Sequence, residues 1–310
     1  MPSATIRALL KTQRAQLFGL CELRGVKRLG PIYEKSRAEL EEKLAALVRA
    51  GRGKSFTAFH IRQVLAQVYD VVSNFQDELG LHLTKQQSVA TALAQRHVIK
   101  SATTLERFFT GHAPVLQVES AAVLRGIDHR VVPSLLDRYR RSARLYGPPV
   151  VKAIKDQLAL SMIQSEPLDA AVDRVAGTDG IFAGQRWRAE RIARTELSYG
   201  FHAVANESMR EIHRTDMPDM KRTLVSTFDD RTGKDSFEQH MQVRGMDEPF
   251  EYHVLDSKGH RTGKIIRYDF PPNRPHDRST LLPWRDGWPK MAVGDPGAVE
   301  PRSPPSGLTP

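Results

Sequence analysis

The chain has 310 residues, of which 40% are hydrophobic and 26% are charged. At about 150 residues per domain, this length predicts about two domains and a sizeable core. The composition excludes a wholly disordered protein, which would carry fewer hydrophobic residues and a larger charge imbalance. No run reaches the roughly 18 apolar residues of a membrane span, and Arg7, Lys11 and Arg14 interrupt the N-terminal stretch. We therefore expect neither a membrane-spanning nor an exported protein.

Cys21 is the only cysteine of the chain. A single thiol excludes an internal disulfide and a zinc site built from paired cysteines. The sequence therefore predicts assembly in a reducing cytosol.

The net charge of +10 is unevenly distributed along the chain. Residues 1–178 carry 26 Lys and Arg against 16 Asp and Glu, whereas residues 179–310 carry 20 of each. A basic balance favours contact with an anionic partner such as nucleic acid, but it also serves solubility. Both interpretations stay open on charge alone.

Residues 1–178 show mainly helical periodicity, because their apolar residues recur at spacings of three and four. The predicted helices cover residues 32–50, 57–79, 85–98, 131–145 and 150–164. Glycine and proline are expected to separate these helices at residues 51–53, 80, 111–114 and 147–149.

The periodicity changes in the last third of the chain. Glycines at 177, 180 and 184 precede a long predicted helix over residues 185–213. Alternating and β-branched residues then predict strands at 223–228, 250–254 and 264–270, with a turn at 256–259 that makes a hairpin of the last two. We expect an α+β fold with a basic, mainly helical domain (1–178), a long helix leading into a small β-rich module (179–289) and a disordered tail (290–310).

The densest polar cluster begins at Asp229 and Asp230. It continues through Arg231, Thr232, Gly233, Lys234 and Asp235 to His240, with His253, His260 and His276 further along. Two carboxylates and a histidine can bind a divalent metal or act in hydrolysis. However, consecutive strand residues point to opposite faces, and the same residues are typical of a capped turn. We expect no catalytic, metal-binding or cofactor-binding residue here.

Other sequence patterns that would indicate a metal-binding, phosphate-binding or catalytic site are missing or ambiguous. His202 and His213 share a helix face but lie about 16 Å apart along the axis, too far for one metal. The chain has no phosphate-binding glycine loop and no Gly-x-Ser-x-Gly elbow. A run of arginines accompanied by Tyr139 and Tyr146 can clamp phosphates, although a solvated helix face explains it equally well. Its members are Arg138, Arg140, Arg141 and Arg144.

The order of the later motifs resembles the Mu F-like phage head morphogenesis domain, also called the minor capsid or minor head protein family. The resemblance covers roughly residues 185–285 and rests on the order and spacing of the motifs. The residues that carry it are Arg194, Thr195, Glu196, Asp229, Asp230, Thr232, His240 and Gly245, followed by the turn at 247–250 and the segment at 270–272. A tryptophan before the Asp-x-x-Thr motif and a cysteine-rich ending, both common in that family, have no counterpart at 224–228 and 276–280.

The resemblance implies a structural component of the virion rather than an enzyme. Such a protein joins the head early in assembly, lies inside the capsid near the portal, and is present during genome packaging and ejection. The resemblance implies the portal protein as a partner. The basic helical domain at 1–178 suits contact with double-stranded DNA or with acidic surfaces of other head proteins, such as the major capsid protein or scaffold. Two alternatives stay open: a metal-dependent phosphodiesterase or nuclease using Asp229, Asp230 and His240, and a free nucleic-acid-binding protein.

Overall fold

The computed structural model describes residues 2–51, 57–227, 234–256, 260–275, 277–286 and 288. These residues form long helices followed by a small group of strands, which confirms the α+β prediction. The tail expected at 290–310 lies outside the described residues. No helix in the described part of the chain is long and apolar enough to cross a membrane.

The chain divides into two compact units, each assembled from separate segments. We call residues 19–87 and 134–197 the helical unit, and residues 1–18, 88–133 and 198–310 the β unit. Three helices contribute to both units: α3 (Ala58–Thr110), α4 (Ala121–Arg144) and α8 (Arg186–Thr215). Each unit therefore contains residues from both sides of the boundary expected at residue 178.

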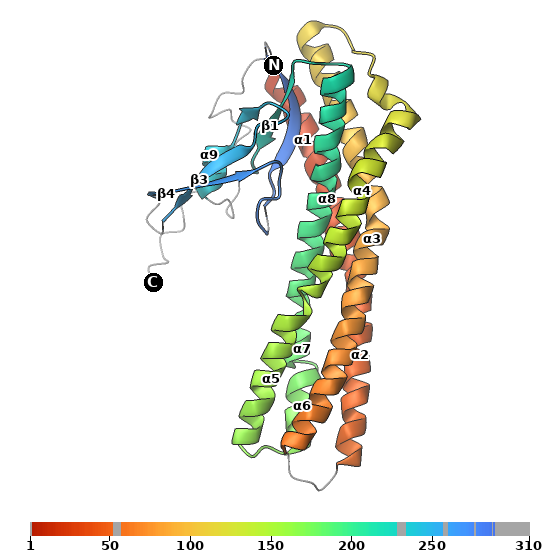
Figure 1. The fold of residues 1–310 in the computed structure, drawn as a ribbon, viewed down its shortest axis with the longest axis vertical. Coiled ribbons are helices and arrows are strands. Elements are labelled where there is room, and N and C mark those ends of the chain that lie inside the picture. The colour runs from red at the N-terminus through yellow and green to blue at the C-terminus, as the bar shows by residue number, and fades with distance from the viewer. Residues whose placement is uncertain are drawn as a thin grey trace. The chain divides into compact units, whose positions relative to one another are not determined.

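The helical unit consists of helices from two distant parts of the sequence. Besides its portions of α3, α4 and α8, it contains the π-helix η1 (Gly19–Val26), α2 (Lys27–Ala50), α5 (Gly147–Ile163), α6 (Leu168–Ala176) and α7 (Ile181–Gly184). Figure 1 shows α2 beside the N-terminal part of α3, where Lys35 pairs with Glu78 at 2.7 Å.

Four aromatic side chains pack together in the core of the helical unit. Tyr33 stacks on Phe182 and contacts Phe75 edge-on, both with ring centroids 5.3 Å away, and Phe75 also meets Tyr146 at 4.8 Å.

The β unit combines one sheet and one hairpin with helices. Its three-stranded sheet has the order β2 (Val243–Arg244), β1 (Met220–Val225), β5 (Thr280–Arg285), and all neighbours are antiparallel. The hairpin pairs β3 (Phe250–Leu255) with β4 (Arg261–Tyr268), and both strands are labelled in Figure 1. The other elements are α1 (Pro2–Phe18), the 3-10 turn η2 (Gln117–Glu119) and α9 (Lys234–Gln239).

The core of the β unit joins residues from both ends of the chain. One hydrophobic cluster of this core consists of Leu9, Leu10, Leu105, Val225, Leu282, Trp284 and Trp288. The side chain of Gln13 on α1 also donates a hydrogen bond to the backbone oxygen of Leu281 on β5. The first helix is therefore part of the hydrophobic core on which the last strand packs.

The separation of two helices at Gly80 was predicted wrongly. The predicted helices at 57–79 and 85–98 are one continuous helix, α3, which passes through Gly80. An internal glycine costs a helix only about 1 kcal/mol relative to alanine. Burial of Leu79 and Leu83 on either side outweighs that cost.

Other predicted boundaries shift by smaller amounts. The helix predicted at 131–145 begins earlier, at Ala121, and that predicted at 150–164 begins at Gly147, with the two following prolines in its first turn. The long helix predicted at 185–213 is confirmed as α8. The strand predicted at 223–228 lies earlier, from Met220 to Val225, and residues 226 and 227 do not continue it.

The predicted hairpin is confirmed, with a local irregularity. Tyr252 pairs with Ile266 and Phe250 with Tyr268, as the alternation predicts. The register shifts between His253 and Leu255, so Val254 does not continue the pairing expected with residues 265–268. Between the pairs His253–Ile265 and Leu255–Arg261, β4 contains two more residues than β3, so the regular pairing of the strands is interrupted at Val254.

Replacing Phe250 with alanine should lower the free energy of unfolding by about 3–5 kcal/mol, because Phe250 is completely buried and the substitution leaves a cavity. Ile265→Ala is the matched control, since this side chain lies on the same hairpin but is 41% exposed. Denaturant unfolding measures both variants. Equal effects of the two substitutions would show that the hairpin does not pack as described.

Candidate functional site

Arg222 on β1 lies at the centre of the β unit and is fully buried. Its guanidinium donates four hydrogen bonds to groups from three segments, namely α8, the turn at 245–248 and the end of the 261–269 segment. Nη1 donates to the side-chain oxygen of Asn206 on α8 and to the backbone oxygen of Asp269, both at 2.6 Å. Nη2 donates to the backbone oxygen of Glu248 at 2.6 Å, and Nε to that of Gly245 at 3.2 Å. We call this set the Arg222 cluster.

The Arg222 cluster connects the segments that carry the later family motifs. Gly245 and Glu248 belong to the turn before β3, and Asp269 immediately precedes the segment at 270–272. The guanidinium also lies over the ring of Phe250, with 5.2 Å between its central carbon and the ring centroid. Burial lowers the pKa of Arg222 to about 10, although carboxylates of the same region oppose this shift. Arg222 therefore remains charged and holds three backbone carbonyls in a fixed arrangement.

Sequence reasoning missed Arg222, although a signal was present. Residues 220, 222 and 224 share one face of β1, and the neighbouring Met220 and Leu224 are both buried. A charged residue at an inward position between two apolar ones indicates a buried and hydrogen-bonded group. The predicted strand began at residue 223, so Arg222 was excluded.

His240, the histidine of the predicted polar cluster, accepts a hydrogen bond at Nδ1 from the backbone N–H of Ser226, 3.2 Å away. Burial, and secondarily the charge of Arg14, lower the pKa of His240 to about 4. The neutral ring therefore connects the end of β1 to the end of α9.

Part of that polar cluster lies in segments that the structure does not describe. Asp229, Asp230 and Thr232 lie outside the described residues, as does His276. Within the described ranges no group of three His, Cys, Asp or Glu side chains is arranged to hold a metal ion. His253 pairs instead with Glu238, and His260 with Asp256.

Arg194, the first motif residue on α8, lies in the helical unit. Its guanidinium forms a bidentate pair with Glu22 of the π-helix η1, at 2.7 and 3.1 Å. The thiol of Cys21 donates to the backbone oxygen of Arg194 at 3.7 Å, and burial raises the pKa of this thiol to about 12. The side chain of His82 donates to the backbone oxygen of Gly25 at 2.9 Å. These contacts fix an irregular helical segment, and they leave Cys21 protonated and unsuited to act as a nucleophile.

Glu196, the third motif residue, is also buried and pairs with the predicted contact residue Arg138. The Glu196 carboxylate accepts hydrogen bonds from Arg138 at 2.6 and 3.2 Å. Removing Arg138 would leave this buried carboxylate without its counterion. Thr195, between the two charged motif residues, has a buried hydroxyl with no hydrogen-bond partner in the described part of the chain.

The remaining arginines of the predicted contact face are exposed at the end of α4. Arg141 pairs with Asp137 one turn earlier, an exposed pair that contributes little to stability. Arg140 and Arg144 have no carboxylate partner among the residues that the structure describes. The structure therefore separates the four predicted arginines into one with a structural pair, Arg138, and three that are available to a partner.

Two further histidines are buried in the β unit, His97 on α3 and His202 on α8. His202 Nδ1 donates to the backbone oxygen of Ser198 at 2.8 Å, and its Nε2 has no hydrogen-bond partner among the described residues. Burial lowers the pKa of His97 to about 3 and that of His202 to about 4. Both rings are therefore neutral at neutral pH.

Four of the motif residues that the structure describes take part in internal contacts. Arg194 and Glu196 form ion pairs, and His240 and Gly245 form hydrogen bonds. Such an arrangement can hold a surface in a defined shape for a macromolecular partner. Comparison with known proteins finds no match to this chain among protein-family models, curated proteins or solved structures.

Proposed function

We propose that this protein is a structural minor head protein of a tailed bacteriophage. The observation that carries the proposal is the Arg222 cluster, which gathers the turn at 245–248, the end of the 261–269 segment and α8 around one guanidinium. These segments carry the motifs whose order resembles the Mu F-like domain. Their role in holding the module together supports a structural component rather than an enzyme.

The proposed partners follow from the resemblance and from the surface of the helical unit. The protein binds the portal protein on the inner side of the capsid and contacts the major capsid protein or scaffold. It assembles in the host cytoplasm and acts in head assembly, packaging or ejection. The exposed arginines on α4 support an additional contact with double-stranded DNA.

Purified procapsids and mature heads should contain this chain, because a minor head protein is incorporated during assembly. Mass spectrometry of gradient-purified heads, compared with the soluble fraction of the same infected cells, measures this. Detection only in the soluble fraction would contradict the proposal. Metal-dependent DNA cleavage by the purified protein that disappears in Asp230→Asn would support the nuclease alternative instead.

DNA affinity should depend on the three available arginines. Replacing Arg140, Arg141 and Arg144 with glutamine should reduce the slope of log affinity against log salt by about three, because each arginine bound to a phosphate contributes about 0.9 to that slope. Arg138 is left in place because its removal would leave the buried Glu196 carboxylate without its counterion. Fluorescence anisotropy on a short duplex across a salt series measures the slope for the full chain.

The matched control for this experiment replaces Arg49, Arg62 and Lys155 with glutamine. These exposed cations also lie in the helical unit, and their removal changes the net charge by the same amount. An equal reduction of slope in both triple variants would mean that DNA affinity depends only on the overall charge of the protein and not on the arginines of α4.

A further inference from the structure

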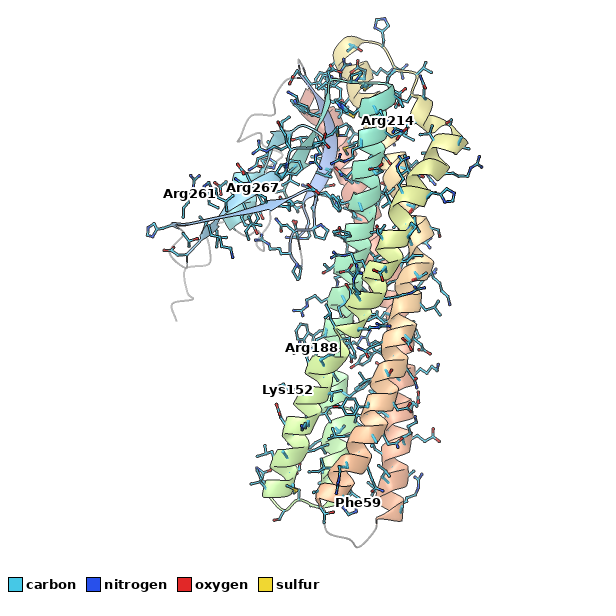
Figure 2. The ribbon with its side chains drawn as sticks, in the orientation of Figure 1. Phe59, Lys152, Arg188, Arg214, Arg261 and Arg267 are labelled. Atoms are coloured by element: carbon cyan, nitrogen blue, oxygen red, sulfur yellow. The ribbon has the colours of Figure 1, made fainter. Side chains whose placement is uncertain are left out.

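The N-terminal end of α8 carries an exposed aromatic residue flanked by two arginines. The side chain of Trp187 is 47% exposed. The central guanidinium carbon of Arg188 lies 4.6 Å from the centroid of the Trp187 ring, and that of Arg191 lies 4.8 Å from it. Arg188 is labelled in Figure 2. We call Trp187, Arg188 and Arg191 the tryptophan–arginine patch.

The two arginines of the patch keep an uncompensated positive charge. Arg188 Nε donates to the side-chain oxygen of Gln185, and neither arginine has a carboxylate partner among the described residues. The nearest acidic residue along the helix, Glu190, already pairs with Arg186 at 2.9 Å and with Arg194 at 3.4 Å. The first turn of α8 contains no acidic residue. The patch therefore attracts a negatively charged group from outside the chain.

The same patch offers apolar surface together with its charge. Stacking on the indole orients the planar guanidiniums while leaving their outer N–H groups available to bind a carboxylate in bidentate fashion. Tryptophan and arginine are the residue types most enriched at binding hot spots of protein interfaces. A DNA duplex presents mainly sugar and phosphate to such a surface, and therefore offers little apolar area to cover the indole. A protein segment with Asp or Glu beside apolar side chains complements both features.

We propose that the tryptophan–arginine patch is a docking site for an acidic segment of another protein that also carries apolar side chains. The acidic side chains bind Arg188 and Arg191, and an apolar side chain covers the exposed part of Trp187. This inference is independent of the phage assignment, because it depends only on the charge and exposure of these three residues.

The test uses the full-length protein and a fluorescein-labelled synthetic peptide of alternating Glu and Leu pairs. Two reference peptides are used. In the first, Gln replaces every Glu, and in the second, Ala replaces every Leu. The Glu-Leu peptide should bind the wild-type protein more tightly than either reference peptide. Trp187→Ala should weaken this binding about thirtyfold, as expected for a hot-spot residue, and the double variant Arg188→Gln/Arg191→Gln should have a comparable effect.

Matched controls remove similar groups elsewhere on the helical unit. Tyr69→Ala removes an aromatic side chain that is 56% exposed, and Arg49→Gln/Arg62→Gln removes two exposed charges. Both controls should retain wild-type affinity. The proposal is overturned if the wild-type protein does not bind the Glu-Leu peptide, or if the controls weaken binding as much as the patch variants. It is also overturned if the patch variants weaken the binding of a short DNA duplex more strongly than they weaken the binding of the Glu-Leu peptide.

Discussion

Replacing Arg222 with alanine should destabilise the β unit by about 3–5 kcal/mol. The substitution leaves the side-chain oxygen of Asn206 and the backbone oxygens of Gly245, Glu248 and Asp269 without their common donor. It also leaves a cavity beside Phe250. Arg222→Lys should recover only part of the stability, because an ammonium cannot reproduce the planar arrangement of guanidinium donors.

Denaturant unfolding followed by tryptophan fluorescence measures this effect. In a Trp187→Phe background the remaining tryptophans, Trp284 and Trp288, both belong to the β unit and report on it directly. The matched control is Arg267→Ala on β4, whose exposed pair with Glu251 should contribute about 1 kcal/mol or less. If Arg222→Ala unfolds at the same denaturant concentration as the control, the buried cluster does not organise the unit.

Acidification from pH 7.5 to pH 4.5 should also destabilise the β unit, because two buried histidines are neutral in the folded protein. Burial lowers the pKa of His97 to about 3, and positive charge on His202 and on Lys100 acts in the same direction, whereas a hydrogen bond with the backbone of Leu281 opposes the shift. The pKa of His202 is lowered by burial to about 4, although Asp277 opposes the shift. His202 already donates from Nδ1, so a proton at Nε2 would create a buried donor without an acceptor.

The sign of the effect follows from the lowered pKa values. The unfolded chain binds protons at these histidines as the pH falls below about 6.5, whereas the folded chain does not. The contribution of the two histidines to the free energy of unfolding is therefore fully present above about pH 6.5. It decreases as the pH falls toward their folded-state pKa values. At about 1.4 kcal/mol for each pKa unit, the two histidines together account for a decrease on the order of 5 kcal/mol by pH 4.5.

Unfolding at the two pH values isolates this contribution. In His97→Asn/His202→Asn, the change in unfolding free energy between pH 7.5 and 4.5 should be smaller than in the wild type by that amount. Carboxylate titrations and the half-buried His240 are common to both proteins and cancel in the comparison. An equal pH dependence in the two proteins would show that these histidines are not held neutral by the fold.

The sequence predicts helices well where packing and local periodicity agree. The helix predicted at 185–213 agrees closely with α8, in which Gly200 is the only helix-breaking residue type and no proline occurs. The break at Gly80 was wrong because burial on both sides of a glycine is a tertiary effect. The composition of the units was not foreseen either, since α1 shares a core with Leu282 and Trp284, which lie more than 250 residues later in the chain.

The candidate site was predicted less well than the fold, since its geometry depends on contacts between distant segments. The motif residues were identified by their order, but their partners were not. Nothing local indicates that Arg194 pairs with Glu22, or that Glu196 pairs with Arg138. The four acceptors of Arg222 could not be predicted, because they come from positions 206, 245, 248 and 269, which converge only in the folded unit.

The proposed function is tested most directly by co-expressing this chain with a candidate portal protein and purifying the complex through a tag on the portal. We predict that the two proteins elute together in size-exclusion chromatography at a constant ratio. Arg222→Ala, which disrupts the module bearing the motifs that resemble the Mu F-like domain, should reduce the amount of chain in that peak, whereas Arg267→Ala should not. Elution of the wild-type chain entirely apart from the portal would contradict the account.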